Sequence, residues 1–478
     1  MKKDKWICII AMFCACLYCV GLIVTACGQT PPTQDNSDDI EASPSTGMTM
    51  GYEERFFDTT TVHTLDIQIN KNAWQDLKEN ALQKTYHDCT LVVDGEAFQL
   101  VGVRTKGNST LLQSVIREWD RHSLVFNFGK FNKSQRYYGL DKISLYNNAC
   151  DASYLKDMIC YNLMRQMGVS TPLCSYTAVY LNGEYLGLYV AMEGVDTSFA
   201  VRNFGYNYGQ LYKPEQFDVA AILNGEMADR VSLDITQLLA EDGKVEINQL
   251  LNIPTETVAL QYQGDKLSTY REIWDNAVFK IGKNDKKRLV AALKNINERT
   301  NLEKSVDMDE LARYFAVNAF VLNTDDYSTN MAHNYYLYEK DGMLRMLPWD
   351  YDQTMGTVGS VGDAGDLTAF MNLPIDTPVN GVILDERPML ACLINDEKGL
   401  NLYHQALNTL MNDYVTSGYL SDFIERNVQM ITPYVEKDPT GPGMEKFQTA
   451  VQSVKDFCDL RSQSIQGQLS GSIPATAE

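Results

Sequence analysis

The sequence predicts an α+β protein with two lobes, the first rich in strands and the second mostly helical. In the first half, alternating apolar residues flank Asp94-Gly95 and Asn182-Gly183, two dipeptides that favour tight β-hairpin turns. In the second half, apolar residues recur at the spacing of one helix face. We therefore expect a β-rich N-lobe at residues 51–213, a helical C-lobe at 214–440, and a C-terminal helix and tail at 441–478.

The first strands of the N-lobe follow from simple alternation. Residues 62–69 place Val62, Leu65 and other apolar side chains as in a half-buried strand. Asn70 is a good helix N-cap, and we expect a helix at 71–81. The hairpin around Asp94-Gly95 should join strands 86–94 and 97–105.

The rest of the N-lobe contains one prominent helix among further strands. Residues 123–128 carry apolar side chains on one face and predict a strand. Residues 153–167 have helical periodicity and stop at Gly168, a residue favoured just after a helix end. Residues 176–181 and 185–192 should then pair across the second turn.

The C-lobe reads as helices with one β element. A short hairpin is expected from 334–338 and 343–347, turning at Asp341-Gly342. The helical patterns cover residues 286–298, 307–322, 399–414 and 419–434.

The N-terminus predicts export. A basic start precedes an apolar run at residues 6–25, which ends in Val24-Thr25-Ala26-Cys27, the pattern of a lipoprotein cleavage site. We expect a signal peptide at 1–26 and a lipid on Cys27 that anchors the chain to the extracytoplasmic face of the cell membrane. The alternative, an uncleaved N-terminal anchor, also leaves the domain outside.

A polar segment follows the anchor. Residues 27–50 consist of the lipidated cysteine and a stretch rich in Pro, Ser, Thr and Asp without apolar periodicity. Such a composition buries too little surface to order itself, so we expect a disordered tether. The six later cysteines form no CxxC pair, and the histidines show no metal-binding spacing.

The charge of the chain limits its partners. The formal net charge is −21, which argues against nucleic acid and against anionic lipid as binding partners. A nucleotide would therefore need a locally basic or metal-lined pocket in this acidic protein.

The window at residues 323–356 has the residues that phosphoryl transfer needs. That reaction uses one carboxylate to orient the attacking hydroxyl, and a carboxylate with an amide to hold Mg²⁺ against the phosphates. Asp325 precedes Asn330 by five residues, the spacing of base and metal-binding asparagine in protein kinases, and Asp350 follows the hairpin. An alternative is a glycan hydrolase with Asp325 and Asp350 as an acid/base pair, which requires a carboxylate separation that sequence does not give.

The N-lobe supplies candidates for nucleotide contacts. Lys106 lies at the end of a strand, with Arg104 two residues earlier on the same face, and both are candidates to bind phosphate. Arg121 is a third candidate cation. Glu193 ends an apolar strand in the manner of a kinase hinge, where backbone groups meet adenine, and Asp157 is a candidate partner for one of the cations. The alternative for each is an ordinary strand-end or helix residue.

Several stretches together resemble the CotH family of atypical protein kinases, from about residue 60 to 435. The resemblance lies in residues 103–109, 139–142, 182–189, 209–213, 323–330, 333–338 and 348–352. The chain departs from ordinary kinases, because it has no HRD, DFG or GxGxxG sequence.

The resemblance implies a bilobal atypical kinase fold that phosphorylates protein Ser/Thr, spore-coat proteins among them, with ATP and Mg²⁺ or Mn²⁺. Asp325 matches the catalytic aspartate and Asp350 the metal-binding aspartate; Asn334 or Asn330 would be the second metal ligand. Asp326 is a candidate substitute base, and Asp352 supports the metal site or caps a turn. The expected partners are a nucleotide, an acceptor protein of the coat or envelope, and the membrane through the lipid. The alternative is a non-catalytic cell-envelope or spore-coat scaffold.

Overall fold

The computed structural model describes residues 47–116, 118–216, 218, 255–356 and 370–477. All of them belong to one compact unit that extends from Thr46 to the C-terminus. The predicted signal peptide, Cys27 and all but the last four residues of the predicted tether lie outside the described residues.

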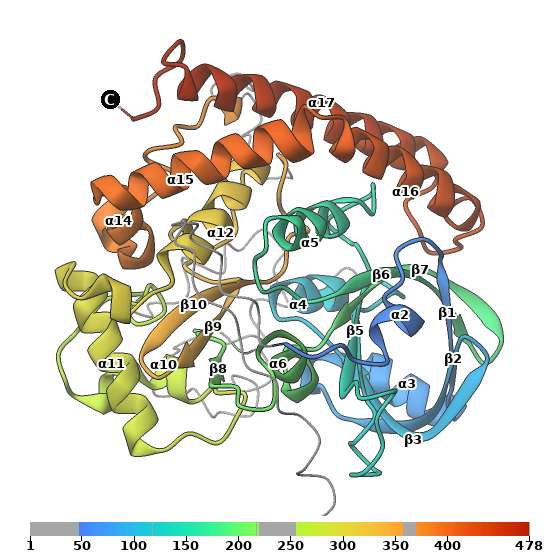
Figure 1. Ribbon diagram of the computed structural model, residues 1–478. Coiled ribbons are helices and arrows are strands. Elements are labelled where there is room, and N and C mark those ends of the chain that lie inside the picture. Colours follow the sequence, from blue (N-terminus) through green and yellow to red (C-terminus); the bar gives the residue numbers. More distant parts are fainter. Residues whose placement is uncertain (1–46, 117, 217, 219–254, 357–369, 478) are drawn as a thin grey trace, which may run out of the picture. The chain divides into compact units, whose positions relative to one another are not determined.

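Seven strands of the first half close into a barrel (Figure 1). The strands follow one another around the barrel in the order β1-β2-β3-β4-β5-β7-β6, and β6 then pairs in parallel with β1 to complete the ring. Their bounds are β1 His63–Gln68, β2 His87–Val93, β3 Glu96–Thr105, β4 Leu124–Asn127, β5 Lys142–Tyr146, β6 Cys174–Leu181 and β7 Glu184–Glu193.

The local signals that predicted this half are confirmed. Asp94 and Gly95 have φ of 46° and 87°, and Asn182 and Gly183 have 51° and 86°, the left-handed conformations that tight β-hairpin turns require. The Asn70 side chain accepts a hydrogen bond from the backbone N–H of Asn72 and so caps helix α3 (Lys71–Glu79). The alternating apolar residues form the core that the barrel encloses.

A second, three-stranded sheet has the order β10-β9-β8 (Figure 1). The predicted hairpin is β9 (Tyr335–Lys340) and β10 (Met343–Pro348). Strand β8 (Gln210–Tyr212) was not predicted and pairs with β9 through Leu211 and Tyr338. It ends one residue before the expected lobe boundary at 213, so this sheet contains residues from both sides of that boundary.

Helices make up most of the second half. The predicted helices correspond to α5 Lys156–Gln166, α11 Lys283–Glu298, α12 Met308–Val321, α15 Glu397–Thr409, α16 Tyr419–Val435 and α17 Met444–Leu469. The structure adds α2 Glu53–Phe56, α4 Ser109–Ile116, α6 Thr197–Phe204, α10 Arg271–Trp274 and α14 Pro388–Ile394.

The α+β class is therefore confirmed. Helix α12 is almost wholly buried and packs against α5, α14, α15 and β10, so it places its C-terminal end firmly beside the hairpin. Among the helices that the structure describes, none has both the length and the hydropathy needed to cross a membrane.

Candidate active site

The loop that carries Asp325 begins where α12 ends. Leu322 has φ of 45°, which turns the chain out of the helix. The Asn323 side chain then accepts a hydrogen bond from the backbone N–H of Asp325 at 3.1 Å. Asp326 is fully buried and accepts hydrogen bonds from the backbone N–H and the hydroxyl of Ser328, at 2.8 and 2.6 Å. Asp326 thus shapes the loop, and its neighbour Asp325 presents its carboxylate at the surface of the site.

Three side chains hold the Asp325 carboxylate. His333 Nε2 lies 2.7 Å from Oδ1, while Asn334 Nδ2 and Gln353 Nε2 each donate to Oδ2 at 2.9 Å. The side chain is still 21% exposed, so a substrate can reach it. Burial opposes a charge on His333, but the negative charge of Asp325 and their hydrogen bond raise the histidine pKa to about 9.

Asp350 follows β10 in a left-handed conformation, with φ of 60°. Its backbone N–H donates to the Tyr161 hydroxyl of α5 at 2.9 Å, which fixes the exit of the hairpin against that helix. The next residue, Tyr351, donates its backbone N–H to Asp157 at 3.0 Å. Asp157, the predicted helix residue, and Asp350, the predicted metal-binding aspartate, are therefore neighbours.

The carboxylates around Asp350 repel one another. Burial and then the charge of Asp350 raise the pKa of Asp157 to about 7, and the same two causes raise the pKa of Asp352. A bound cation would relieve this repulsion. Among the described residues no three His, Cys, Asp or Glu side chains form a complete metal cage. Mg²⁺ rarely needs such a cage, since it keeps waters and takes one or two carboxylates plus substrate phosphates.

Lys106 directly follows β3 and lies close enough to Asp350, Asp157 and Asp352 for their charges to act on it. Its Nζ is 3.5 Å from the ring centroid of Tyr146 and 5.5 Å from that of Trp349. Burial lowers the lysine pKa to about 8, although Asp350 opposes this shift. No carboxylate in the described part of the chain lies within ion-pair distance, 4 Å, of the Lys106 ammonium group.

Two further cations accompany the predicted pair, Arg104 and Lys106. Lys213, directly after β8, pairs with Glu215 at 3.1 Å. Lys84 pairs with Asp218 at 3.2 Å. The positive charge of Lys213 helps to lower the pKa of both Lys84 and Lys106, and Arg104 acts in the same direction on Lys84, so the four cations gather in one region. Lys84 and Lys213 were missed because only the tertiary fold brings them here.

Three other predicted residues lie elsewhere or are engaged. Asn330 is exposed, and of the two candidate asparagines it is Asn334 that contacts Asp325. Glu193 is fully buried in an ion pair with Arg202 at 2.6 Å, so its carboxylate is used inside the fold. A contact of the Glu193 backbone with adenine stays a prediction. Arg121 pairs with Asp438 at 2.7 Å, and its charge is compensated there.

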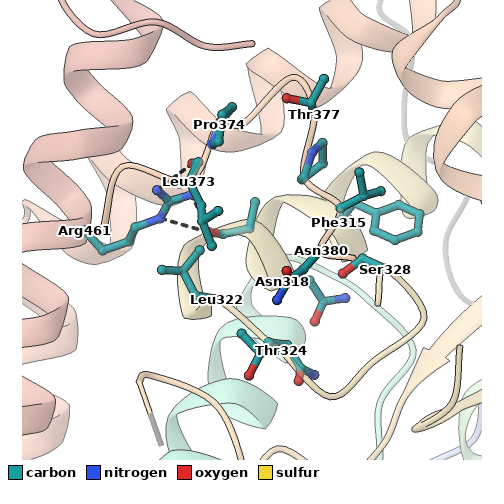
Figure 2. A pocket seen from close by; sticks show the side chains of 14 residues that line it. Phe315, Asn318, Leu322, Thr324, Ser328, Leu373, Pro374, Thr377, Asn380 and Arg461 are labelled. Carbon is teal, nitrogen blue, oxygen red and sulfur yellow. Dashed lines mark hydrogen bonds between the residues drawn. The ribbon is translucent and has the colours of Figure 1, made fainter. Parts of the chain in front are cut away.

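A small cavity of about 40 Å³ borders the loop at residues 323–328 (Figure 2). Thr324 and Ser328 of the loop line it, together with Arg461 of α17, and the Asp325 side chain does not. Arg461 donates hydrogen bonds to the carbonyls of Ala319, Met371 and Leu373. This volume holds a few water molecules at most. The cavity therefore belongs to the packing that supports the loop.

Comparison with known proteins defines the class. A family model described as CotH kinase protein matches residues 103–465, and the chain belongs to this family. The match includes Lys106, Asp325 and Asp350 but not β1 or β2. One relative is the inner spore coat protein H of Bacillus subtilis (strain 168), which is 21% identical over 365 residues, 75% of this chain and 85% of that protein.

Proposed function

We propose that the protein is a kinase that transfers the γ-phosphate of ATP to Ser or Thr hydroxyls of an acceptor protein. The observation that carries this proposal is the placement of a solvent-reachable, firmly held Asp325 carboxylate close enough to Asp350 and Asp352 for their charges to act on the same groups, with a group of cations close by. Membership of the CotH kinase family supports the same reaction. The proposal includes the bilobal kinase-like arrangement, with the barrel in the role of the N-lobe.

Each group has a role in such a reaction. Asp325 orients the acceptor hydroxyl and takes up its proton. The hydroxyl oxygen bonds to the γ-phosphorus while the bond from that phosphorus to the β–γ bridging oxygen breaks, and ADP leaves. Asp350 and Asn334 would hold Mg²⁺ or Mn²⁺, which neutralises phosphate charge when bound. Lys106 and Arg104, with Lys84 and Lys213, are suited to bind the phosphates.

The mutual repulsion of these carboxylates is unfavourable in the protein alone and would be relieved by a bound metal ion. Burial and the negative charge of Asp350 raise the pKa of Asp157 and of Asp352, and a divalent cation would remove the cost of holding these carboxylates ionised. Lys106 fits a phosphate for the complementary reason, since it is a half-buried cation without an ion-pair partner among the described residues. The site thus has complementary charges for a metal–nucleotide complex.

The location outside the cytoplasm is part of the proposal. It rests on the signal-like N-terminus and on Cys27, which would carry the lipid that holds the catalytic unit at the membrane. A globomycin-sensitive change in the mass of the chain in cells would test the lipid, and Cys27→Ser should remove it.

A thermal-shift titration of the full chain with ATP tests the nucleotide site. We expect a Mg²⁺-dependent rise in melting temperature that Asp350→Asn removes, because ligands that bind only the folded state stabilise it. Asparagine tolerates the left-handed backbone of this position, so the change removes charge with little strain. The matched control is Asp422→Ala, an exposed carboxylate in the first turn of α16, which should leave the shift intact.

A non-catalytic scaffold is the second candidate, and it is favoured by the relative in Bacillus subtilis, which is an inner spore coat protein. The same titration separates the two functions. A scaffold without a nucleotide site would show no shift with ATP at any Mg²⁺ concentration.

A further inference from the structure

A second, much larger cavity lies next to the connection between β5 and α5. Its volume is about 590 Å³, within the usual range of ligand pockets. The cavity is bordered by residues 118–121, by residues 147–149 with Ala152 and Tyr154, and by the segment 439–442 with Lys446 of α17.

The wall of this cavity is continuous with the candidate active site. Tyr146, the last residue of β5, packs against the Lys106 ammonium group, and the next residue, Asn147, lines the cavity. Cys150 lies further along the same connection. After burial, the charges of Asp352 and Asp350 contribute most to the raised pKa of its thiol, so these carboxylates are close to Cys150. One short connection therefore forms a wall of both sites.

The inner side of the cavity is preformed. Arg121 lies in its wall and is tied to Asp438 at 2.7 Å, and Asp438 also accepts the backbone N–H of Leu188 at 2.9 Å. Asn147 is fixed as well, because its Nδ2 donates to the Arg121 carbonyl at 2.9 Å. Asn148 is 8% exposed, and its side-chain oxygen has no hydrogen-bond partner among the described residues. One buried polar atom of the wall is therefore unsatisfied within the described part of the fold.

The lining suits a polypeptide better than a nucleotide. Trp119, Pro439 and Pro442 give apolar surface, while Glu118 and Lys446 add opposite charges at exposed positions. None of the four cations suited to phosphate lines this cavity, and Glu118 with Asp120 would repel a polyphosphate. A peptide combines apolar side chains with amide donors and acceptors, and aromatic and amide side chains recognise both.

We propose that this cavity binds a polypeptide segment of the phosphate-accepting protein, beside the serine or threonine that enters the active site. The inference rests on the proposed function for the identity of the bound chain. Peptide binding in the cavity does not depend on catalysis, so an experiment can disprove the peptide site and the proposed kinase activity separately.

A photo-crosslinking experiment tests the cavity directly. The full chain carries Trp119→p-benzoylphenylalanine, and the probe is a biotinylated library of short random peptides with a central Ser or Thr. We expect capture about tenfold above that of Gln452→p-benzoylphenylalanine, an exposed position on α17 that does not line the cavity. Adding Ala149→Trp, which fills the cavity from an exposed position, should lower capture to the control level.

The possible outcomes distinguish a peptide site from non-specific capture and from a nucleotide site. Capture that ATP and Mg²⁺ leave unchanged and that Ala149→Trp removes supports the peptide site. Equal capture at positions 119 and 452 overturns the inference, and so does capture that ATP and Mg²⁺ abolish, which would make the cavity part of the nucleotide site. A melting temperature near wild type for Ala149→Trp shows that the variant folds. If it unfolds, Lys446→Glu, at an exposed rim position, replaces it as the competing change.

Discussion

Two charged regions of this protein, one fully buried and one half-buried, are arranged in opposite ways. At the end of β7, Glu193 and Arg202 form a complete ion pair, and the Leu173 N–H and Tyr52 hydroxyl fill the remaining positions on the carboxylate. At the end of β3, Lys106 rests on aromatic rings without a carboxylate in ion-pair distance among the described residues. Buried charges are costly unless they are paired. We therefore expect the paired region to stabilise the fold and the unpaired one to bind a ligand.

The same contrast separates the carboxylates. Asp438 is saturated by Arg121, the Leu188 N–H and the Thr440 N–H. Asp157 and Asp352 instead have pKa values raised by burial and by Asp350. Charges that destabilise one another within a fold persist mainly where function needs them. Substitutions in the two regions should accordingly affect different properties.

The largest effect is expected at Asp325. Asp325→Asn keeps the size of the side chain but cannot take up the hydroxyl proton, so phosphate transfer should fall by about 10²–10⁴-fold. Transfer would be followed with radiolabelled ATP and an acceptor mixture from the envelope. The melting temperature should change by only a few degrees. Transfer at the wild-type rate would remove Asp325 from the mechanism.

The Glu193–Arg202 pair should matter for stability instead. Glu193→Ala leaves a buried guanidinium without its partner and should lower the free energy of unfolding by about 3–5 kcal/mol. Urea unfolding measures this change. The double variant Glu193→Met with Arg202→Met should recover most of the loss, because it removes both charges. A cost below about 1 kcal/mol for Glu193→Ala would show that the pair is not structural.

Lys106→Met should weaken nucleotide binding without lowering stability, the reverse of what we expect for Glu193→Ala. Losing one charged contact to phosphate, worth about 1.5–3 kcal/mol, should weaken binding of ATP with Mg²⁺ by roughly 10- to 100-fold. The free energy of unfolding should stay the same or rise, since the variant no longer buries an unpaired charge. Calorimetric titration gives the affinity. Lower stability with unchanged affinity would assign Lys106 to the fold.

The smallest effect is a pH dependence at His333. The folded-state pKa of about 9 lies above the ordinary value of 6.5, so the stabilisation is complete below pH 6.5 and is lost as the pH rises through about 9. Wild type should therefore exceed His333→Gln in unfolding free energy by about 1–2 kcal/mol at pH 6, with the difference shrinking towards pH 10. A difference that does not vary with pH would mean that His333 is neutral in the fold.

Local signals in the sequence predicted local structure well. The two hairpin turns, the Asn70 cap and the length of α12 depend on residues close together in the chain. Strand β8 has only three residues, and α14 is buried on all sides, so neither shows the alternation or the amphipathic period that identifies such elements. The closure of the barrel by β1 and β6 had no local signal at all.

The same distinction between local sequence signals and tertiary contacts applies to the residues of the candidate site. Asp325 and Asp350 stood out because the spacing of the window resembles that of kinases, and Asn334 is near Asp325 in the chain. Lys84 and Lys213 come from distant segments, and no pattern around them indicates their approach to Lys106. Glu193 resembled a hinge residue because a strand ends there, but its partner Arg202 lies on the following helix α6 and binds its side chain.

The parallel pairing of β1 with β6 has a consequence for folding. His63 and its partner Thr177 are separated in the chain by the intervening strands and α5, so ring closure is a contact of long sequence separation and carries a loop-closure entropy. Such contacts slow folding. Until they form, β1 and β6 expose unpaired edges that can pair with other chains. The completed ring hides those edges, and resistance to aggregation should therefore appear late, when the first strand is finally joined to the sixth.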